Sequence, residues 1–116
     1  MSDILDSLQE QETIGYWHDT GHAQIKQEAG LADQFELLTL NCDRLAGFHI
    51  HDVTGEDRDH SEVGTGRVNF ERISQFFQPS HALVLELHPA LKTEQVRASH
   101  EILLELLKNR EKELGL

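Results

Sequence analysis

The sequence contains few of the features that mark secreted or membrane proteins. Its single cysteine, Cys42, excludes an internal disulfide and agrees with a reducing compartment. No apolar run approaches the roughly 18 residues of a transmembrane helix, and the opening residues lack the basic start of a secretory signal peptide. We therefore expect a cytoplasmic protein that does not span a membrane.

Basic residues are scarce as well. The 116 residues include 10 Lys and Arg against 21 Asp and Glu, which gives a formal net charge of -11. Binding to nucleic acid depends on Lys and Arg side chains that displace counterions from the phosphates. The charge therefore argues against a nucleic-acid partner, and the 8 histidines are the feature that needs an explanation.

The length fits one domain over residues 1–116, and the pattern predicts an α/β fold. Apolar strand-like segments alternate with amphipathic segments three times, after a short helical pattern at the start. The strands are expected at 14–17, 46–52 and 82–89, and the helices at 2–12, 22–30, 32–45, from Asn69 to before Pro79, and from Thr93 onward. Such alternation is typical of a parallel sheet with helical crossovers.

Apolar spacing predicts which helix faces are buried and leaves one long loop. Residues 32–45 place Phe35, Leu38, Cys42 and Leu45 on one side, and the last helix places Val96, His100, Leu103 and Leu107 on one side. Asn69 and Thr93 are the expected N-caps. Residues 54–67 are charged and rich in glycine, which predicts a functional loop.

Each predicted strand delivers ionisable side chains at its carboxyl end, where parallel α/β folds place their active sites. Asp19, His49 and Glu86 occupy these positions, and such a set suits Mn²⁺, Mg²⁺, Co²⁺ or Zn²⁺. The alternative for each residue alone is a polar group that closes a strand near water. Glu86 favours the metal because it follows three apolar residues, and a buried carboxylate is costly unless it is paired.

A second group includes His22, three residues after Asp19, and His60 in the loop. These histidines could bind a second metal or a substrate hydroxyl or phosphate. Arg58 and Arg67 are available for an anion. The alternative is a solvated, charged loop with no ligand.

Four motifs together resemble a known family. They are DTGH at 19–22, FHIHD at 48–52, DH at 59–60 followed by GTGRVNF at 64–70, and LELHP at 85–89. Their order and spacing resemble the sugar phosphate isomerase/epimerase family, also called the xylose isomerase-like TIM-barrel superfamily. The endonuclease IV type of abasic-site nuclease belongs to the same superfamily. The resemblance extends from roughly residue 13 to the end of the chain.

The resemblance implies a metal-dependent proton transfer on a sugar or sugar phosphate. In that family Glu, Asp, His and Glu hold a divalent metal, and the last three correspond to Asp19, His49 and Glu86. Glu86 would also be a catalytic acid/base. His22, and with it His60 and Arg67, would bind the substrate.

The resemblance also implies an incomplete barrel. A full (β/α)₈ barrel has about 250 residues, whereas this chain resembles only about three C-terminal βα units. The strand with the first metal-binding Glu has no counterpart, so we expect a partial TIM barrel that has a three-ligand metal site and is at most weakly active alone. Unpaired strand edges predict a homo-oligomer or a complementing chain.

Two other functions stay open. The chain could be a non-catalytic fragment or pseudo-enzyme that binds metal or a partner. It could also be a relative of the abasic-site nucleases, although the charge of -11 opposes this. Many relatives carry an acid two positions before the loop histidine, where this sequence has Arg58, which also disfavours the metal chemistry of the nucleases.

Overall fold

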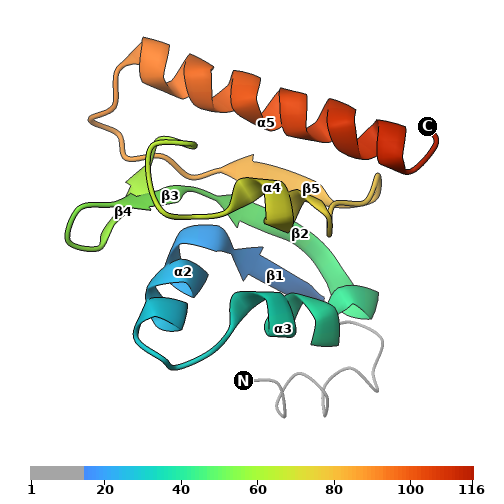
Figure 1. Cartoon of the computed structure of the whole chain (residues 1–116). Helices are drawn as coiled ribbons and strands as arrows, with labels where there is room; N and C mark the ends of the chain where they lie inside the picture. Colours follow the sequence, from blue (N-terminus) through green and yellow to red (C-terminus); the bar gives the residue numbers. More distant parts are fainter. Residues whose placement is uncertain (1–14) are drawn as a thin grey trace.

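A three-stranded parallel sheet forms the centre of the computed structural model, which describes residues 15–116 (Figure 1). Strands β1 (Tyr16–Asp19), β2 (Leu45–Ile50) and β5 (Ala82–Leu85) lie in the order β1-β2-β5. The predicted α/β class with parallel strands is therefore confirmed. The helix predicted at 2–12 lies outside the described residues.

Within residues 15–116, four α-helices and one 3₁₀ turn connect and cover the strands. They are α2 (Thr20–Glu28), α3 (Gln34–Leu40), η1 (Cys42–Arg44), α4 (Phe70–Ser74) and α5 (Thr93–Glu113). Asp19, Asp33 and Asn69 cap the first turns of α2, α3 and α4 with their side-chain oxygens. The cap predicted at Asn69 is therefore confirmed. None of the helices within residues 15–116 combines the length and the apolar composition that crossing a bilayer requires.

One face of the sheet packs against the helices and forms the core. Phe48 and Ile50 of β2 are fully buried there, and Leu83 and Leu85 of β5 pack beside them. The helices contribute Phe35 and Leu38 from α3, Phe70 and Ile73 from α4, and Leu103, Leu106 and Leu107 from α5. Alternate residues of these strands point to the opposite face of the sheet, which no helix within residues 15–116 covers.

The uncovered face carries Trp17, Gly47 and Ala82 in one register row, followed by Asp19, His49 and Val84 in the next. Trp17 and Val84 are 45% and 42% exposed. The indole lies against Gly47, where an added Cβ would stand 2.7 Å from Trp17 Cζ3 and would also collide with the carbonyl of Ala82. Glycine is thus required where the tryptophan crosses β2.

The segment predicted as a loop at 54–67 contains an antiparallel hairpin, which corrects that prediction. Strand β3 (Asp52–Thr54) pairs with β4 (Arg58–Ser61), and the hydroxyls of Thr54 and Ser61 lie 2.9 Å apart across the pair. Gly55 and Asp57 turn the chain with positive φ angles of 52° and 55°. The hairpin lacks a long apolar alternation, so its sequence resembles a loop.

Two predicted helix faces were wrong in part, and one predicted N-cap was wrong: Phe35, Leu38, Leu45 and Leu103 are buried as predicted and Leu107 packs against the core, but other members of the two faces are exposed. The helix expected over 32–45 ends at Leu40, and Cys42 in the following 3₁₀ turn is exposed. On α5, Ser99 and Leu103 are buried, whereas Val96 is 41% exposed and His100 is exposed. Ser99 is buried because its hydroxyl accepts the backbone N–H of Val63 at 2.9 Å. Lys92, not Thr93, is the N-cap of this helix.

Candidate metal centre

The carboxyl ends of the three strands bring the predicted ligands together. Asp19 and His49 are register partners on β1 and β2. Glu86 directly follows β5, and its backbone N–H donates to the carbonyl of Ile50 at 3.0 Å, which extends the strand pairing to the site. His49 Nδ1 lies 2.5 Å from Glu86 Oε1. The site therefore forms at the edge where the strand pattern placed it.

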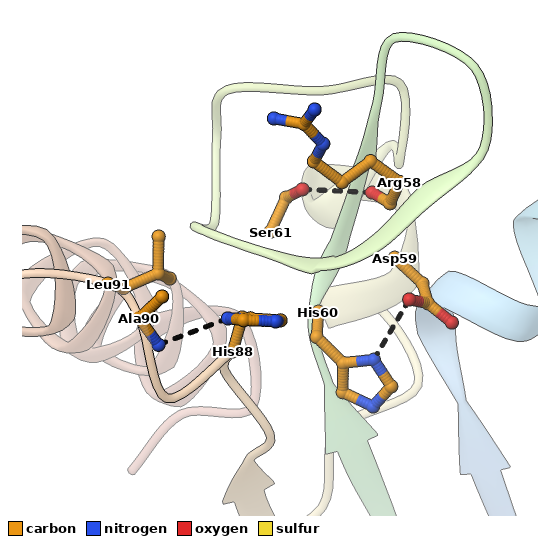
Figure 2. A pocket seen from close by; sticks show the side chains of 7 residues that line it. All are labelled: Arg58, Asp59, His60, Ser61, His88, Ala90 and Leu91. Carbon is orange, nitrogen blue, oxygen red and sulfur yellow. Dashed lines mark hydrogen bonds and ion pairs between the residues drawn. The ribbon is translucent and has the colours of Figure 1, made fainter.

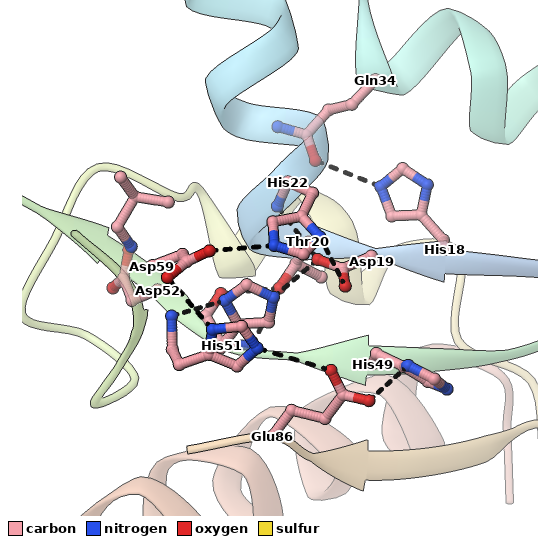
Figure 3. A network of polar contacts seen from close by, with 12 residues as sticks. His18, Asp19, Thr20, His22, Gln34, His49, His51, Asp52, Asp59 and Glu86 are labelled. Carbon is pink, nitrogen blue, oxygen red and sulfur yellow. Dashed lines mark hydrogen bonds and ion pairs between the residues drawn. The ribbon is translucent and has the colours of Figure 1, made fainter. Parts of the chain in front are cut away.

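Carboxylates and imidazoles alternate across this edge in a continuous series, which we call the acid–histidine chain (Figure 3). Its members, in spatial order, are His49, Glu86, His60, Asp59, His22, Asp19 and His51. The nitrogen-to-oxygen distances along it are 2.5, 3.9, 3.1, 2.9, 3.2 and 2.6 Å. Each carboxylate thus lies between two imidazole rings, an arrangement suited to holding cations.

Asp19 is the most strongly perturbed acid of the site. Burial alone would raise its pKa, but the hydrogen bond from the His51 side chain and the N–H of His22 lower the pKa to about 2. The carboxylate also serves as the N-cap of α2, since its Oδ1 accepts the His22 N–H at 2.9 Å. Asp19 is therefore a fixed anion at the carboxyl end of β1.

His51 is fully buried although it belongs to the polar site. Its Nε2 lies 2.6 Å from Asp19 Oδ1, and its Nδ1 accepts the backbone N–H of His60 at 2.9 Å. The Thr20 hydroxyl donates to the His51 carbonyl at 2.7 Å and accepts the His51 N–H at 3.0 Å. Both the ring and the backbone of this residue are thus held in place.

The hairpin supplies Asp59 and His60 to the site. His60 has a positive φ of 54°, which is uncommon for a residue other than glycine, and its ring stacks on His51 with centroids 4.2 Å apart. The hydrogen bond with His60, opposed by slight desolvation and aided by His22, lowers the pKa of Asp59. A pocket of about 290 Å³ opens beside these residues (Figure 2).

The pocket gives a small ligand access to the acid–histidine chain. Figure 2 shows the rings of His60 and His88 on its wall, with His60 bonded to Asp59. The backbone N–H of His88 donates to the His60 carbonyl at 2.9 Å, so β4 and the segment after β5 are joined at this point. The other lining residues are Arg58, Ser61, Ala90 and Leu91.

Arg67, predicted to bind a substrate anion, lies among carboxylates of its own chain. Its Nε and Nη2 donate to the two oxygens of Glu28 at 2.7 and 3.0 Å, and Nη2 also reaches Asp57 at 3.2 Å. Hydrogen bonding to Glu28 raises the pKa of Arg67, and the same bond lowers the pKa of Glu28. Arg67 therefore ties the loop to α2, and its donors already face acids.

Glu86 is less buried than its apolar neighbours predict. Its side chain is 31% exposed because it lies on the uncovered face just past the strand. Two groups of donor atoms within the described residues lie within 4.8 Å of one another, namely Asp19, His51 and Glu86, and His22, His51 and His60. His49 belongs to neither group, although it contacts Glu86 directly.

Sequence reasoning missed His51 and Asp59 as members of the site, and it gave Asp52 no role. Asp59 and His51 were considered only as members of sequence motifs, and Asp59 also as part of a charged loop, without a role in the site. Asp52 is fully buried and accepts four backbone N–H groups, from Val53, Gly64, Gly66 and Val68, at 2.8 to 3.0 Å. The available signal was the spacing of HIHD and DH, which places histidines beside acids on both segments.

Comparisons with known proteins add no relative. No protein-family model matches the chain, and searches among curated proteins and among solved structures found no match either. The resemblance to the isomerase/epimerase family therefore stays a prediction.

Proposed function

We propose that the acid–histidine chain is a divalent metal centre. We further propose that the 116-residue polypeptide is the metal-binding part of a TIM-barrel sugar or sugar-phosphate isomerase/epimerase. The observation that carries the proposal is that three parallel strands deliver Asp19, His49 and Glu86 to one edge of the sheet, on its uncovered face. In parallel α/β folds this edge is where ligands bind.

The donor set fits a divalent cation. Asp19 and Glu86 offer carboxylate oxygens, and His49 offers a ring nitrogen against Glu86. Oxygen and imidazole donors suit Mn²⁺, Mg²⁺, Co²⁺ or Zn²⁺. We propose that Asp19, His49 and Glu86 hold the metal. When bound, it would polarise the hydroxyl and carbonyl oxygens of the sugar.

The remaining members of the acid–histidine chain have roles on the substrate side. Glu86 is the proposed acid/base that moves a proton at the carbon next to the carbonyl, which requires a carboxylate within hydrogen-bond reach of that proton. His22 and His60 flank Asp59 and are 48% and 33% exposed, so both can contact a substrate hydroxyl. The pocket beside His60 is the proposed entrance.

Titration with Mn²⁺ or Zn²⁺ in a calorimeter tests the metal centre. We expect the wild-type chain to bind one ion, and we expect Glu86→Gln and Asp19→Asn to weaken binding at least about tenfold because each removes a charged ligand. Glu105→Gln is the matched control, since Glu105 is an exposed glutamate on α5. Equal binding by Glu86→Gln and the control would refute the proposed site.

Exchange of solvent deuterium into a ketose or ketose phosphate, followed by NMR, tests the proton transfer. The metal-loaded wild-type chain should catalyse exchange at the carbon next to the carbonyl, slowly if a further carboxylate is needed. Glu86→Gln should abolish that exchange, and the Glu105→Gln control should retain it. Exchange that survives Glu86→Gln unchanged would show that Glu86 is not the acid/base.

The uncovered face supports a second candidate, a non-catalytic fragment that needs a partner chain. Strands β1 and β5 are the edges of the described sheet, and Trp17 of β1 is 45% exposed on the uncovered face. Edge strands present unpaired backbone groups that favour association with another strand. Light scattering after size exclusion should therefore show a homo-oligomer or a complex; a compact monomer at every concentration would contradict this candidate.

A further inference from the structure

Both geometric groups of donor atoms contain His51, so proximity alone would make this residue a metal ligand. Its hydrogen bonds indicate a different role. Nδ1 accepts the backbone N–H of His60 at 2.9 Å, and a ring nitrogen that accepts such a bond carries no proton. The ring proton must then be on Nε2, which donates it to Asp19 Oδ1 at 2.6 Å.

This tautomer is incompatible with metal ligation by His51. A metal ion bound at Nε2 needs the lone pair of that nitrogen, so the proton would have to move to Nδ1. A proton on Nδ1 would point at the His60 N–H, placing two donors against each other at the fully buried ring of His51. The backbone of the hairpin therefore blocks the ligand form of the ring.

Several neighbours hold the ring in this orientation. Gly21 lies directly against it, because a Cβ added there would collide with Cε1 and Nδ1 of His51. The His60 ring stacks parallel to the His51 ring, with an interplanar angle of 2°. Thr20 clamps the His51 backbone through both its N–H and its carbonyl. These contacts thus hold the His51 ring in one orientation, in which its hydrogen bonds favour one tautomer.

We infer that His51 is a positioning residue that holds Asp19 as a metal ligand and does not itself bind the metal. The inference rests on the proposed metal centre. His51 fixes Oδ1 of Asp19, while Oδ2 faces His22 Nδ1 at 3.2 Å on the more exposed side of the carboxylate. Partners of this kind orient a ligating carboxylate, and their loss costs about 10- to 100-fold in metal affinity.

Nitrogen-15 NMR of the imidazole rings tests the tautomer in the full chain. Without metal, we expect the His51 Nε2 to be a protonated nitrogen and Nδ1 to be an unprotonated one. Titration with Zn²⁺ alone should change the ring signals of His49 and leave the His51 Nε2–H in place. Loss of the His51 Nε2–H on adding Zn²⁺ would overturn the inference, because it would make His51 a ligand.

Variants at position 51 test the positioning role by calorimetry with Zn²⁺ alone. His51→Leu removes the donor to Asp19 and should lower the affinity about 10- to 100-fold with one bound ion retained. His51→Gln offers an amide N–H in place of Nε2–H and should recover part of that loss. His100→Gln, at an exposed histidine on α5, is the matched control and should bind like the wild type.

The outcomes separate the inference from the proposed function. A wild-type chain that binds no Zn²⁺ refutes the metal centre and this role together. A wild-type chain that binds Zn²⁺ while His51→Leu shows unchanged affinity refutes the positioning role and leaves the metal centre standing. If the variants do not fold, the wild-type NMR titration alone decides between ligand and positioning residue.

Discussion

The two faces of the three-stranded sheet differ in almost every physical property. The covered face presents to the helices Phe48 and Ile50, which are fully buried, with the partly buried Leu83 and Leu85 beside them. The open face presents Trp17, His49 and Val84, which are all partly or largely exposed. Both faces come from the same strands, because alternate residues point in opposite directions.

This difference separates what stabilises the fold from what performs its chemistry. On the covered face, removal of apolar surface from water stabilises the chain. On the open face, ionisable groups remain accessible and contact one another across strand ends. Substitutions on the two faces should therefore have different consequences, and the following variants compare them from the largest effect to the smallest.

Phe48→Ala should cause the largest loss of stability. Its ring is fully buried and packs edge to face on Phe77, with centroids 4.9 Å apart, so truncation leaves a cavity worth about 3–5 kcal/mol. Trp17→Ala on the open face should cost less than half of this. Urea denaturation of both variants measures the difference. Equal losses would mean that another chain covers the open face in solution.

Asp52→Asn and Asp19→Asn form the second comparison. Each Asp52 oxygen accepts two backbone N–H groups, so the NH₂ of asparagine would leave two of these N–H groups facing a donor instead of an acceptor, at a cost of about 2–4 kcal/mol. Asp19→Asn keeps an oxygen for the α2 cap and should cost much less. Thermal unfolding checks both variants. A more destabilised Asp19→Asn would show that the acid–histidine chain supports the fold.

The buried side chain of His18 predicts that the stability of the fold depends on pH. Burial lowers its pKa below the ordinary 6.5, while hydrogen bonding to Gln34 and the charge of Asp19 oppose the shift. The unfolded chain therefore takes up a proton first as pH falls. The contribution to stability is complete above about pH 6.5 and decreases below it, by at most about 1.4 kcal/mol per pH unit.

Urea midpoints of the wild type and His18→Gln between about pH 8 and about pH 5.5, a range that includes the free histidine value, measure this effect. The wild type should lose more stability on acidification than the variant. His81→Gln is a useful second variant, since burial also lowers the pKa of His81. Identical pH slopes for the wild type and His18→Gln would exclude His18 as a source of the acid sensitivity.

Arg67→Gln should have the smallest effect on stability. Its ion pairs with Glu28 and Asp57 are exposed, and exposed pairs are screened by water and salt. The difference in melting temperature from the wild type should shrink further near 1 M salt, where the screening length is about 3 Å. An effect as large as that of Asp52→Asn would show that the tie between the loop and α2 is a principal support.

Local patterns predicted the strands and most of the site because the necessary information lies within a few residues. The apolar runs around Phe48 and Leu83 are short and end in charged residues, so both the strand and its functional end are visible. The cap at Asn69 is likewise a local signal. Asp19, His49 and Glu86 followed from the rule that parallel strands share a carboxyl edge.

The remaining features depend on contacts between distant segments. The hairpin of β3 and β4 is anchored by Asp52 and by the contact of Thr54 with Ser61, not by its own apolar pattern. Burial of His51 depends on a glycine at position 21, because a Cβ there would collide with the His51 ring. Ser99 is buried on α5, on which apolar residues were expected to be buried, because its hydroxyl accepts the backbone N–H of Val63. None of these can be read from the periodicity of one segment.

Asp52 also has a consequence for how this protein can vary. A single carboxylate gathers amides from residues 53, 64, 66 and 68, and so fixes both ends of the segment that carries Asp59 and His60. The turn between Gly55 and Arg58 lies between these anchored ends and donates no hydrogen bond to Asp52. Related sequences could therefore change or lengthen that turn, and with it the shape of the pocket mouth, without rebuilding the site.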